Sequence, residues 1–179
     1  MKIRMDDSVV LVIDIQEKLL PAMIDKDTVL ENCLTFLRGV EALELPVVLT
    51  EQYPKGLGKT VAPILNVIPD AKTFEKMKFS CLEEDVFTYL KESGRKTVLI
   101  CGIEAHVCVL QTIVDLVEAG FKPVLISDCT SSRKENDKMY AVVRAGAENA
   151  VVSTYESVLF ELIGSAKHPK FKDISKIVK

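Results

Sequence analysis

Three side chains suited to nucleophilic catalysis each follow a separate short run of the sequence: Asp14, Lys76 and Cys108. A cysteine thiolate attacks a carbonyl carbon, and a carboxylate can take the thiol proton and pass it to the leaving group. A lysine ammonium keeps a nearby carboxylate ionised and favours the thiolate. Together these residue types predict acyl-transfer chemistry, provided that the fold brings them together.

Cys108 lies in the stretch Thr97–Gly120, which begins with the apolar, β-branched run TVLIC. Such a run is typical of a strand buried on both faces. From about Ala105 the apolar residues take helical spacing, which ends at Gly120. Cys108 therefore falls in the first turn of a helix, where the helix dipole favours a reactive, low-pKa thiolate. The alternative is that Cys108 is a small buried hydrophobic residue.

Asp14 directly follows the apolar run Val9–Ile13, so its carboxylate is either a helix N-cap or a site residue. Lys76 and Lys78 follow a short predicted strand over 71–75, and two solvated loop charges are the simpler explanation for them.

His106 is close to the cysteine in sequence, but residues two apart in a helix do not face each other. We therefore expect His106 to line the pocket rather than to activate Cys108. The segment GLGKT, within Glu51–Thr60, resembles a phosphate-binding loop, but the full pattern needs a glycine where Tyr53 stands. We interpret this segment as a flexible loop with Tyr53 at the edge of a pocket.

Six short apolar runs alternate with helical segments along the chain. This alternation predicts one α/β domain over 1–179, an open six-stranded parallel sheet of Rossmann-like type with helices on both faces. The carboxyl ends of parallel strands meet at one edge of the sheet, which should bring the three candidate residues together. The predicted strands cover 9–13, 46–50, 71–75, 97–101, 122–128 and 150–153, and the predicted helices 28–45, 80–93, 105–119, 135–147 and 156–163.

The composition is that of an ordinary globular protein, with 48% hydrophobic and 27% charged residues among 179. A net charge of -3 gives no footprint for nucleic acid or for an anionic membrane. No apolar run reaches the roughly 18 residues of a membrane span, and the first residues do not resemble a signal peptide. Five scattered cysteines without a CxxC motif favour reduced thiols and a cytoplasmic location. Two histidines without clustered Cys or His ligands argue against a zinc site.

Five motifs, in order and spacing, resemble the isochorismatase-like superfamily of cysteine hydrolases: VIDIQEKLLP, TEQYPKGLG, EKMKFSC, CGIEAHVCV and SDCTSSR. The resemblance extends from about Val9 to Ile163 and implies the isochorismatase-like hydrolase fold with an Asp–Lys–Cys triad. Carried over by motif, the triad is Asp14, Lys76 (in a K-x-x-F-S pattern) and Cys108.

The same resemblance implies a cis peptide bond between Ile103 and Glu104. In that arrangement the N–H groups of Glu104 and Cys108 would stabilise the oxyanion of the reaction. It also implies substrate contacts near the triad, which we expect from Gln16, Tyr53, Phe79, His106 and Val107.

The implied activity is hydrolysis of a small amide, carbamate or related bond through a covalent intermediate on Cys108. Nicotinamidases of this superfamily bind a metal through histidines after the second strand, whereas this chain has EQYPKGLGK there. We therefore expect no metal and no cofactor, a small-molecule substrate, no nucleic-acid or membrane partner, and a homo-oligomer. The alternative function is a non-catalytic interaction or scaffold domain that keeps the fold.

Overall fold

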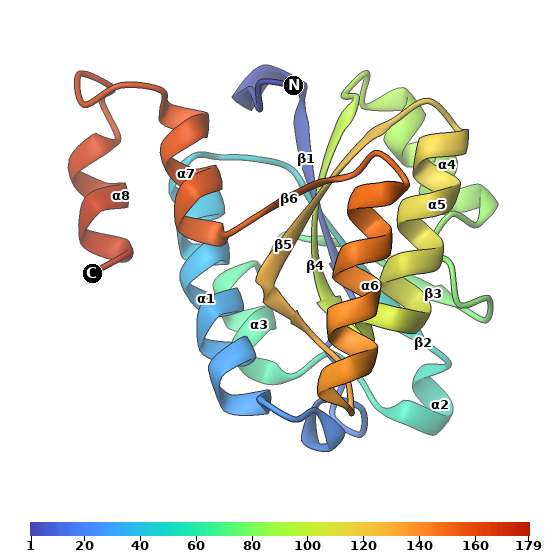
Figure 1. Cartoon of the computed structure of the whole chain (residues 1–179). Helices are drawn as coiled ribbons and strands as arrows, with labels where there is room; N and C mark the ends of the chain where they lie inside the picture. Colours follow the sequence, from blue (N-terminus) through green and yellow to red (C-terminus); the bar gives the residue numbers. More distant parts are fainter.

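The computed structural model describes all 179 residues and contains one parallel sheet of six strands. The strand order is β3-β2-β1-β4-β5-β6, so the chain winds outward from β1 in both directions. The predicted six-stranded α/β fold is therefore confirmed (Figure 1). The strands are β1 (Ser8–Ile13), β2 (Val47–Gln52), β3 (Lys72–Lys76), β4 (Thr97–Ile103), β5 (Lys122–Ser131) and β6 (Val151–Ser153).

Helices cover both faces of the sheet (Figure 1). One face carries α1 (Lys26–Ala42), α3 (Ala62–Val67), α7 (Tyr155–Ile163) and α8 (Phe171–Ile177), and the other carries α4 (Glu84–Glu92), α5 (Leu110–Glu118) and α6 (Glu135–Ala147). The shorter elements are α2 (Pro54–Leu57), 3-10 turns at Met5–Asp7 and Leu20–Ala22, and a π-helical turn at Ala105–Val109. No helix is long and apolar enough to cross a membrane.

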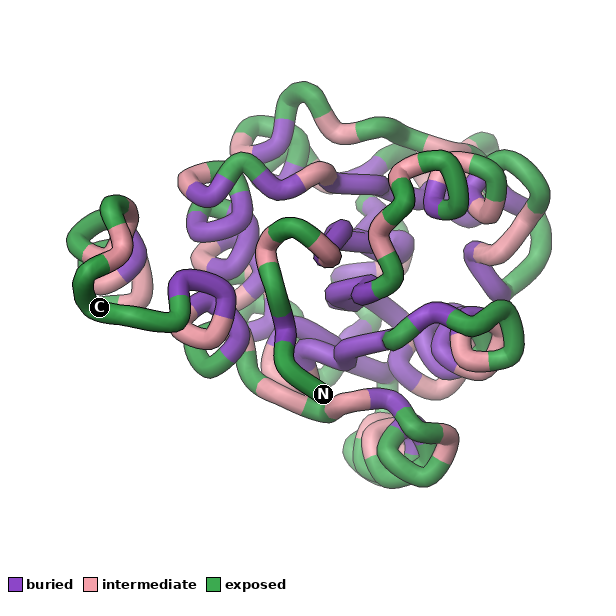
Figure 2. Tube along the Cα trace, turned by 90° about the horizontal axis from the view of Figure 1, so that it is seen from above, coloured by how far each residue is buried: buried purple, intermediate pink, exposed green.

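The central strands form the middle of the core. Every residue of β1 and of β4 is buried, because these strands have neighbours on both sides and helices on both faces. Their alternate side chains enter two separate hydrophobic clusters, one for each face. Figure 2 shows the buried trace in the interior and exposed segments around the rim. Burying one Val, Leu or Ile side chain stabilises the fold by about 1.5–3 kcal/mol, so strands buried on both faces consist of apolar residues. Runs of apolar residues therefore predicted these strands.

Some strands continue beyond the apolar runs that predicted them. β2 extends to Gln52, β5 extends to Ser131, and Lys76 is the last residue of β3 rather than the first of the loop. The extra residues are polar but still pair: Gln52 lies opposite Lys76 in the β2–β3 register. Hydropathy marks only the part of a strand whose two faces both meet apolar helices, so it missed these ends.

The helix expected from Ser80 begins four residues later, at Glu84. The side chain of Glu83 accepts hydrogen bonds from the backbone of Met77 and Lys78, at 3.0 and 2.9 Å, and so it stabilises the preceding loop. Ser80 therefore lies in the loop before the helix, not at its start.

Candidate active site

Asp14 lies at the carboxyl end of β1, in the middle of the sheet. Its neighbour Ile13 is paired with Thr50 on β2 and with Gly102 on β4. Asp14 has a φ of 52°, a left-handed conformation that Asp tolerates better than most residues. Its side chain is fully buried, and Oδ1 accepts a 2.8 Å hydrogen bond from Thr50 Oγ1. The carboxylate receives no backbone N–H, so the helix-cap interpretation of Asp14 is wrong.

Lys76, at the end of β3, brings its ammonium into the same buried space. Its Nζ lies 2.7 Å from Asp14 Oδ2, and the two side chains are 1% and 0% exposed. The Lys76 ammonium donates to Gln52 Oε1 at 2.8 Å, to the Lys78 carbonyl at 3.2 Å and to the Phe79 carbonyl at 3.0 Å. Burial disfavours this charge, but the neighbouring Asp14 carboxylate outweighs it, and the pKa of Lys76 is raised.

The two lysines are thus clearly separated. Lys76 is buried against Asp14, whereas Lys78 is exposed and only its backbone contacts the site. The structure brings Lys76, and not Lys78, to the candidate triad.

One oxygen of Asp14 remains open. The Lys76 ammonium has three acceptors other than Asp14, and its distance of 2.7 Å to Oδ2 is the shortest of these four contacts. No donor makes a properly oriented hydrogen bond to Oδ2, although this atom is buried. Asp14 therefore has a charge-stabilised oxygen with lone pairs free to accept a proton.

Cys108 lies beside that carboxylate, in the π-helical turn that follows β4. The residue is 6% exposed. Burial first, and then the negative charge of Asp14, raise the pKa of the Cys108 thiol to about 12, against a lowering effect of Lys76. The low pKa expected from the helix position is therefore wrong, because desolvation and the adjacent carboxylate outweigh the dipole and the lysine. At neutral pH the resting residue is a thiol, and a base must remove its proton.

The backbone before Cys108 is unusual. Gly102 has a φ of 129°, and a Cβ built there would lie 2.1 Å from the carbonyl oxygen of Ile13, so only glycine fits between β4 and β1. The peptide bond between Ile103 and Glu104 is cis, as expected. The Glu104 carbonyl then accepts from the Val109 amide at 3.2 Å, an i to i+5 bond that makes the turn π-helical. The oxyanion role of Ile103 and Glu104 stays a prediction.

The residues expected to contact substrate fall into two groups. Tyr53 and Phe79 are 48% and 55% exposed, on the loops that follow β2 and β3. His106 and Val107 are half-buried in the turn that carries Cys108. These four remain candidates for substrate contact.

Gln16 differs from these four residues, because its side-chain amide is already hydrogen-bonded within the protein. It is fully buried, and it donates to the carbonyls of Gln52 and Gly58 at 3.0 and 2.6 Å. Its Oε1 accepts from the Gln52 amide at 2.8 Å. Gln16 therefore fixes the loop after β2 and is not retained as a substrate contact.

His106 and Glu104 have partners of their own. His106 Nδ1 lies 3.0 Å from Ser132 Oγ, and Nε2 lies 3.9 Å from Asp137 Oδ2 on α6. The Glu104 carboxylate accepts a 2.9 Å hydrogen bond from Arg133 Nε. The turn that carries Cys108 is thus tied to the segment after β5, and His106 makes no contact that would activate the thiol.

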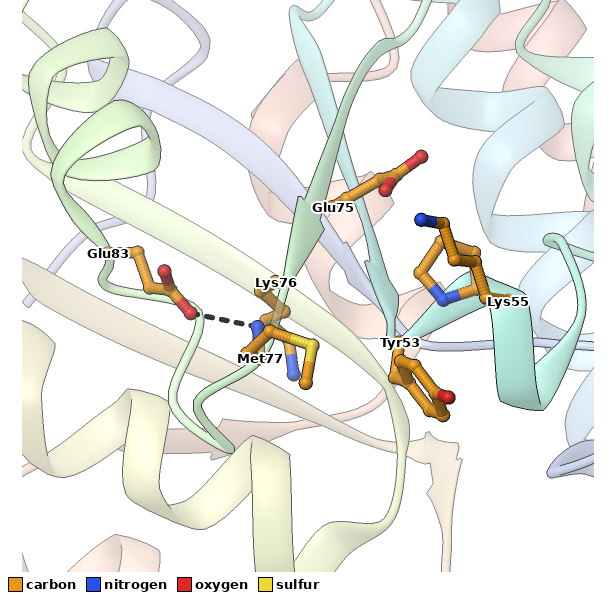
Figure 3. Close-up of a pocket in the computed structure, with 7 residues that line it drawn as sticks. Tyr53, Lys55, Glu75, Lys76, Met77 and Glu83 are labelled. Carbon is orange, nitrogen blue, oxygen red and sulfur yellow. Dashed lines mark hydrogen bonds between the residues drawn. The ribbon is translucent and has the colours of Figure 1, made fainter.

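A surface hollow of about 270 Å³ opens at Lys76 (Figure 3). Tyr53 and Met77 line it together with Lys76, while Asp14 and Cys108 do not. In Figure 3 the hydrogen bond from the Met77 amide to Glu83 holds the loop along one side. The hollow adjoins the triad through Lys76 and is of a size for a small molecule.

Sequence reasoning missed the polar side chains that surround the triad. Thr50 and Gln52 are buried in β2, and Cys81 and Thr112 are buried on the α4–α5 face. A weak signal was present for Thr50, a hydroxyl at the carboxyl end of an apolar strand. No signal identified Thr112, which reads as one polar position within an apolar helix.

Comparisons with known proteins identify the domain. The isochorismatase domain pattern matches residues 8–157. The secreted isochorismatase effector Isc1 of Phytophthora sojae is 40% identical over 177 residues, which cover 96% of this chain and 84% of that protein. Isochorismatase domain-containing protein 2 of Danio rerio is 40% identical over 172 residues, which cover 96% of this chain and 86% of that protein. The solved structure of MAR1 ribonuclease from Caenorhabditis elegans superposes with a TM-score of 0.95 at 34% identity, over 99% of this chain and 92% of that one.

The matched domain, the two relatives and the shared fold converge on one conclusion: this chain belongs to the isochorismatase family.

Proposed function

We propose that this protein is a cysteine hydrolase that cleaves a small amide, carbamate or related bond through a covalent intermediate on Cys108. The observation that carries the proposal is the buried ion pair of Asp14 and Lys76, at 2.7 Å, whose two charges both act on the Cys108 thiol. Thr50 donates to Oδ1 of this carboxylate, but the buried Oδ2 has no hydrogen-bond donor, and a role as proton acceptor explains why such an atom is kept.

The first half of the reaction forms a thioester-type intermediate. As Cys108 Sγ attacks the substrate carbonyl carbon, Asp14 takes the thiol proton and then gives it to the leaving nitrogen. The carbon–nitrogen bond breaks, the amine leaves, and the acyl group stays on sulfur. Because the thiol is protonated at rest, this transfer to Asp14 accompanies the attack.

The second half returns the enzyme to its starting state. Asp14 takes a proton from a water molecule that attacks the thioester carbonyl, and the carbon–sulfur bond breaks. The proton passes to the departing Cys108 sulfur, which restores the thiol, and the acid product leaves. The Lys76 ammonium, 2.7 Å from Asp14, balances the charge of this carboxylate, and backbone N–H groups of Glu104 and Cys108 receive the oxyanion.

The proposed substrate-binding surface consists of exposed and half-buried residues around the triad. Tyr53 and Phe79 from two loops, with His106 and Val107 from the turn, form the mouth of the site. The adjoining hollow of about 270 Å³ favours a small molecule over a polymer. We propose no metal and no cofactor, because the loop after β2 holds no histidine.

We also propose a cytoplasmic homo-oligomer. All five cysteines are free, which suits a reducing compartment. Met139, Tyr140 and Val143 on α6 are 46%, 65% and 65% exposed, an apolar strip typical of a contact between subunits. Sedimentation of the pure protein tests the oligomer.

The alternative is a scaffold domain without catalysis, and a screen with the right controls separates the two. Wild-type protein and Cys108→Ala are incubated with panels of small amides and ureido acids, and released ammonia or amine is measured. We expect turnover by wild type and none by Cys108→Ala. No turnover across both panels, or equal turnover by both proteins, would overturn the proposal.

The screen includes a labelled RNA, because three structural neighbours, among them the MAR1 protein of Caenorhabditis elegans, are named ribonucleases. A net charge of -3 does not favour RNA binding, so we expect no cleavage. RNA cleavage that depends on Cys108 would replace the small-molecule proposal.

A further inference from the structure

Cys81 is a second buried thiol at the triad that the mechanism does not use. It is 0% exposed and lies in the loop between β3 and α4. Its Sγ lies 3.4 Å from Thr50 Oγ1, the same hydroxyl that donates to Asp14 Oδ1 at 2.8 Å. Cys81, Thr50 and Asp14 thus form a continuous chain of contacts.

The direction of this chain follows from the chemistry of its groups. An ionised carboxylate only accepts hydrogen bonds, so the single proton of the Thr50 hydroxyl points to Asp14. Toward Cys81 the Thr50 oxygen can therefore only accept, and the Cys81 S–H must donate. Burial, followed by the charge of Asp14, raises the pKa of Cys81 to about 12, which keeps the thiol in its donor form.

The backbone of Cys81 is tied to the nucleophile as well. The Cys81 amide donates to Thr112 Oγ1 at 2.9 Å, and the Thr112 hydroxyl donates to the Cys108 carbonyl at 2.6 Å. Cys81 is therefore connected through its side chain and Thr50 to the Asp14 carboxylate, and through its backbone and Thr112 to the turn that carries Cys108.

We propose that Thr50 and Cys81 are positioning residues: the chain from Cys81 through Thr50 fixes Asp14 Oδ1, so that the open Oδ2 faces the Cys108 thiol. Cys81 is then a hydrogen-bond donor and not a spare nucleophile. The inference rests on the proposed function for its catalytic meaning, while its geometric part is testable through the Cys108 thiol alone.

Paired substitutions separate positioning from packing. Thr50→Val and Cys81→Ala break the chain, whereas Thr50→Ser and Cys81→Ser keep an O–H at each position. Cys101→Ala is the matched control, because it removes the same sulfur from a buried position on the other face of the sheet. Each variant is compared with wild type by thermal unfolding before the other measurements.

Two readouts follow, and the first needs no substrate. Alkylation of Cys108 by iodoacetamide is measured at fixed pH values with mass mapping. If Asp14 swings away, its charge no longer opposes the thiolate, and the alkylation rate rises tenfold for each unit by which the thiol pKa falls. We expect a rise of about tenfold in Thr50→Val and in Cys81→Ala, and wild-type rates in the two serine variants and in Cys101→Ala.

The second readout is the pH dependence of kcat/KM on a substrate from the screen. A misplaced carboxylate should lower kcat/KM by about 10- to 100-fold. In Thr50→Val the pH profile should change in shape as well as in height, because a displaced carboxylate no longer meets the thiol in the same geometry. Serine should restore both features.

Alkylation and kinetics that do not differ between alanine and serine at position 81, or between valine and serine at position 50, would overturn the positioning role. An altered alkylation rate without any hydrolase activity would support the chain of hydrogen bonds and reject the proposed function instead.

Discussion

Replacing Asp14 by Asn removes the charge of the proposed base while changing the shape of the site very little. Asn is one of the few residues that tolerate the left-handed backbone found at position 14, where φ is 52°. Its side-chain oxygen can still accept the hydrogen bond of Thr50. The variant therefore isolates the negative charge and the ability to take a proton.

Turnover and thiol reactivity should then move in opposite directions. Loss of a positioned proton acceptor typically lowers the rate by about 10²–10⁴-fold. The charge of Asp14 contributes to raising the pKa of Cys108 to about 12, so its removal lowers that pKa and speeds alkylation of Cys108 at a fixed pH. A slower enzyme with a faster thiol is the signature of a general base.

Stability should fall in the same variant. The Lys76 side chain is 1% exposed and would keep its charge without the partner at 2.7 Å. Removing one member of a buried ion pair costs about 3–5 kcal/mol, whereas an exchange of Asp for Asn at a helix cap would cost almost nothing. The three remaining acceptors of Lys76 place the expected loss at the lower end, about 3 kcal/mol.

The assay uses wild type, Asp14→Asn and Asp70→Asn, the last of which changes an exposed carboxylate. Urea unfolding gives the stability, iodoacetamide labelling with mass mapping gives the thiol reactivity, and the substrate from the screen gives the turnover. The reasoning is refuted if Asp14→Asn retains turnover within a few-fold of wild type, or if labelling of Cys108 slows.

Three further predictions follow from the same geometry. Lys76→Ala should abolish activity and Lys78→Ala should change it little, because only the first ammonium reaches the buried carboxylate; equal losses would contradict the assignment. Exhaustive chelation should leave activity intact, because the loop 51–60 lacks metal-binding histidines; loss with EDTA and recovery with zinc would contradict this. Stability should fall between about pH 9 and pH 12, because the pKa values of Cys81 and Cys108 are raised from 9.0 to about 12 and the unfolded chain releases these protons first. Thermal unfolding across that range checks the slope, and a Tm that stays constant or rises would show that the thiols are not buried as described.

The fold was predictable because its signals are local. The apolar runs of β1 and β4 identified strands buried on both faces, and their alternation with helices fixed a parallel sheet. Parallel strands then placed Asp14 and Cys108 at one edge. The ends of β2 and β5 were missed, because hydrogen-bond pairing extends beyond the apolar stretch.

The electrostatics of the site were not predictable in the same way. The helix position and the lysine suggested a lowered pKa for Cys108, but the sign depends on burial and on the distance to Asp14, which only the folded structure gives. Likewise, Gln16 lies in a family motif, and its amide could bind a substrate. In the folded protein that amide is hydrogen-bonded to the backbone of Gln52 instead. Residue type indicates what chemistry is available, and packing decides which groups remain free to perform it.

The most direct test of the proposed mechanism is detection of the covalent intermediate. In a single turnover with a substrate from the screen, samples are quenched rapidly in acid and the five cysteine peptides are mapped by mass spectrometry. We predict a transient mass increase equal to the acyl part of the substrate on the Cys108 peptide alone, and no turnover by Cys108→Ala. Turnover at the wild-type rate by Cys108→Ala, with the Cys108 peptide of wild type unmodified at every time point, would contradict the account.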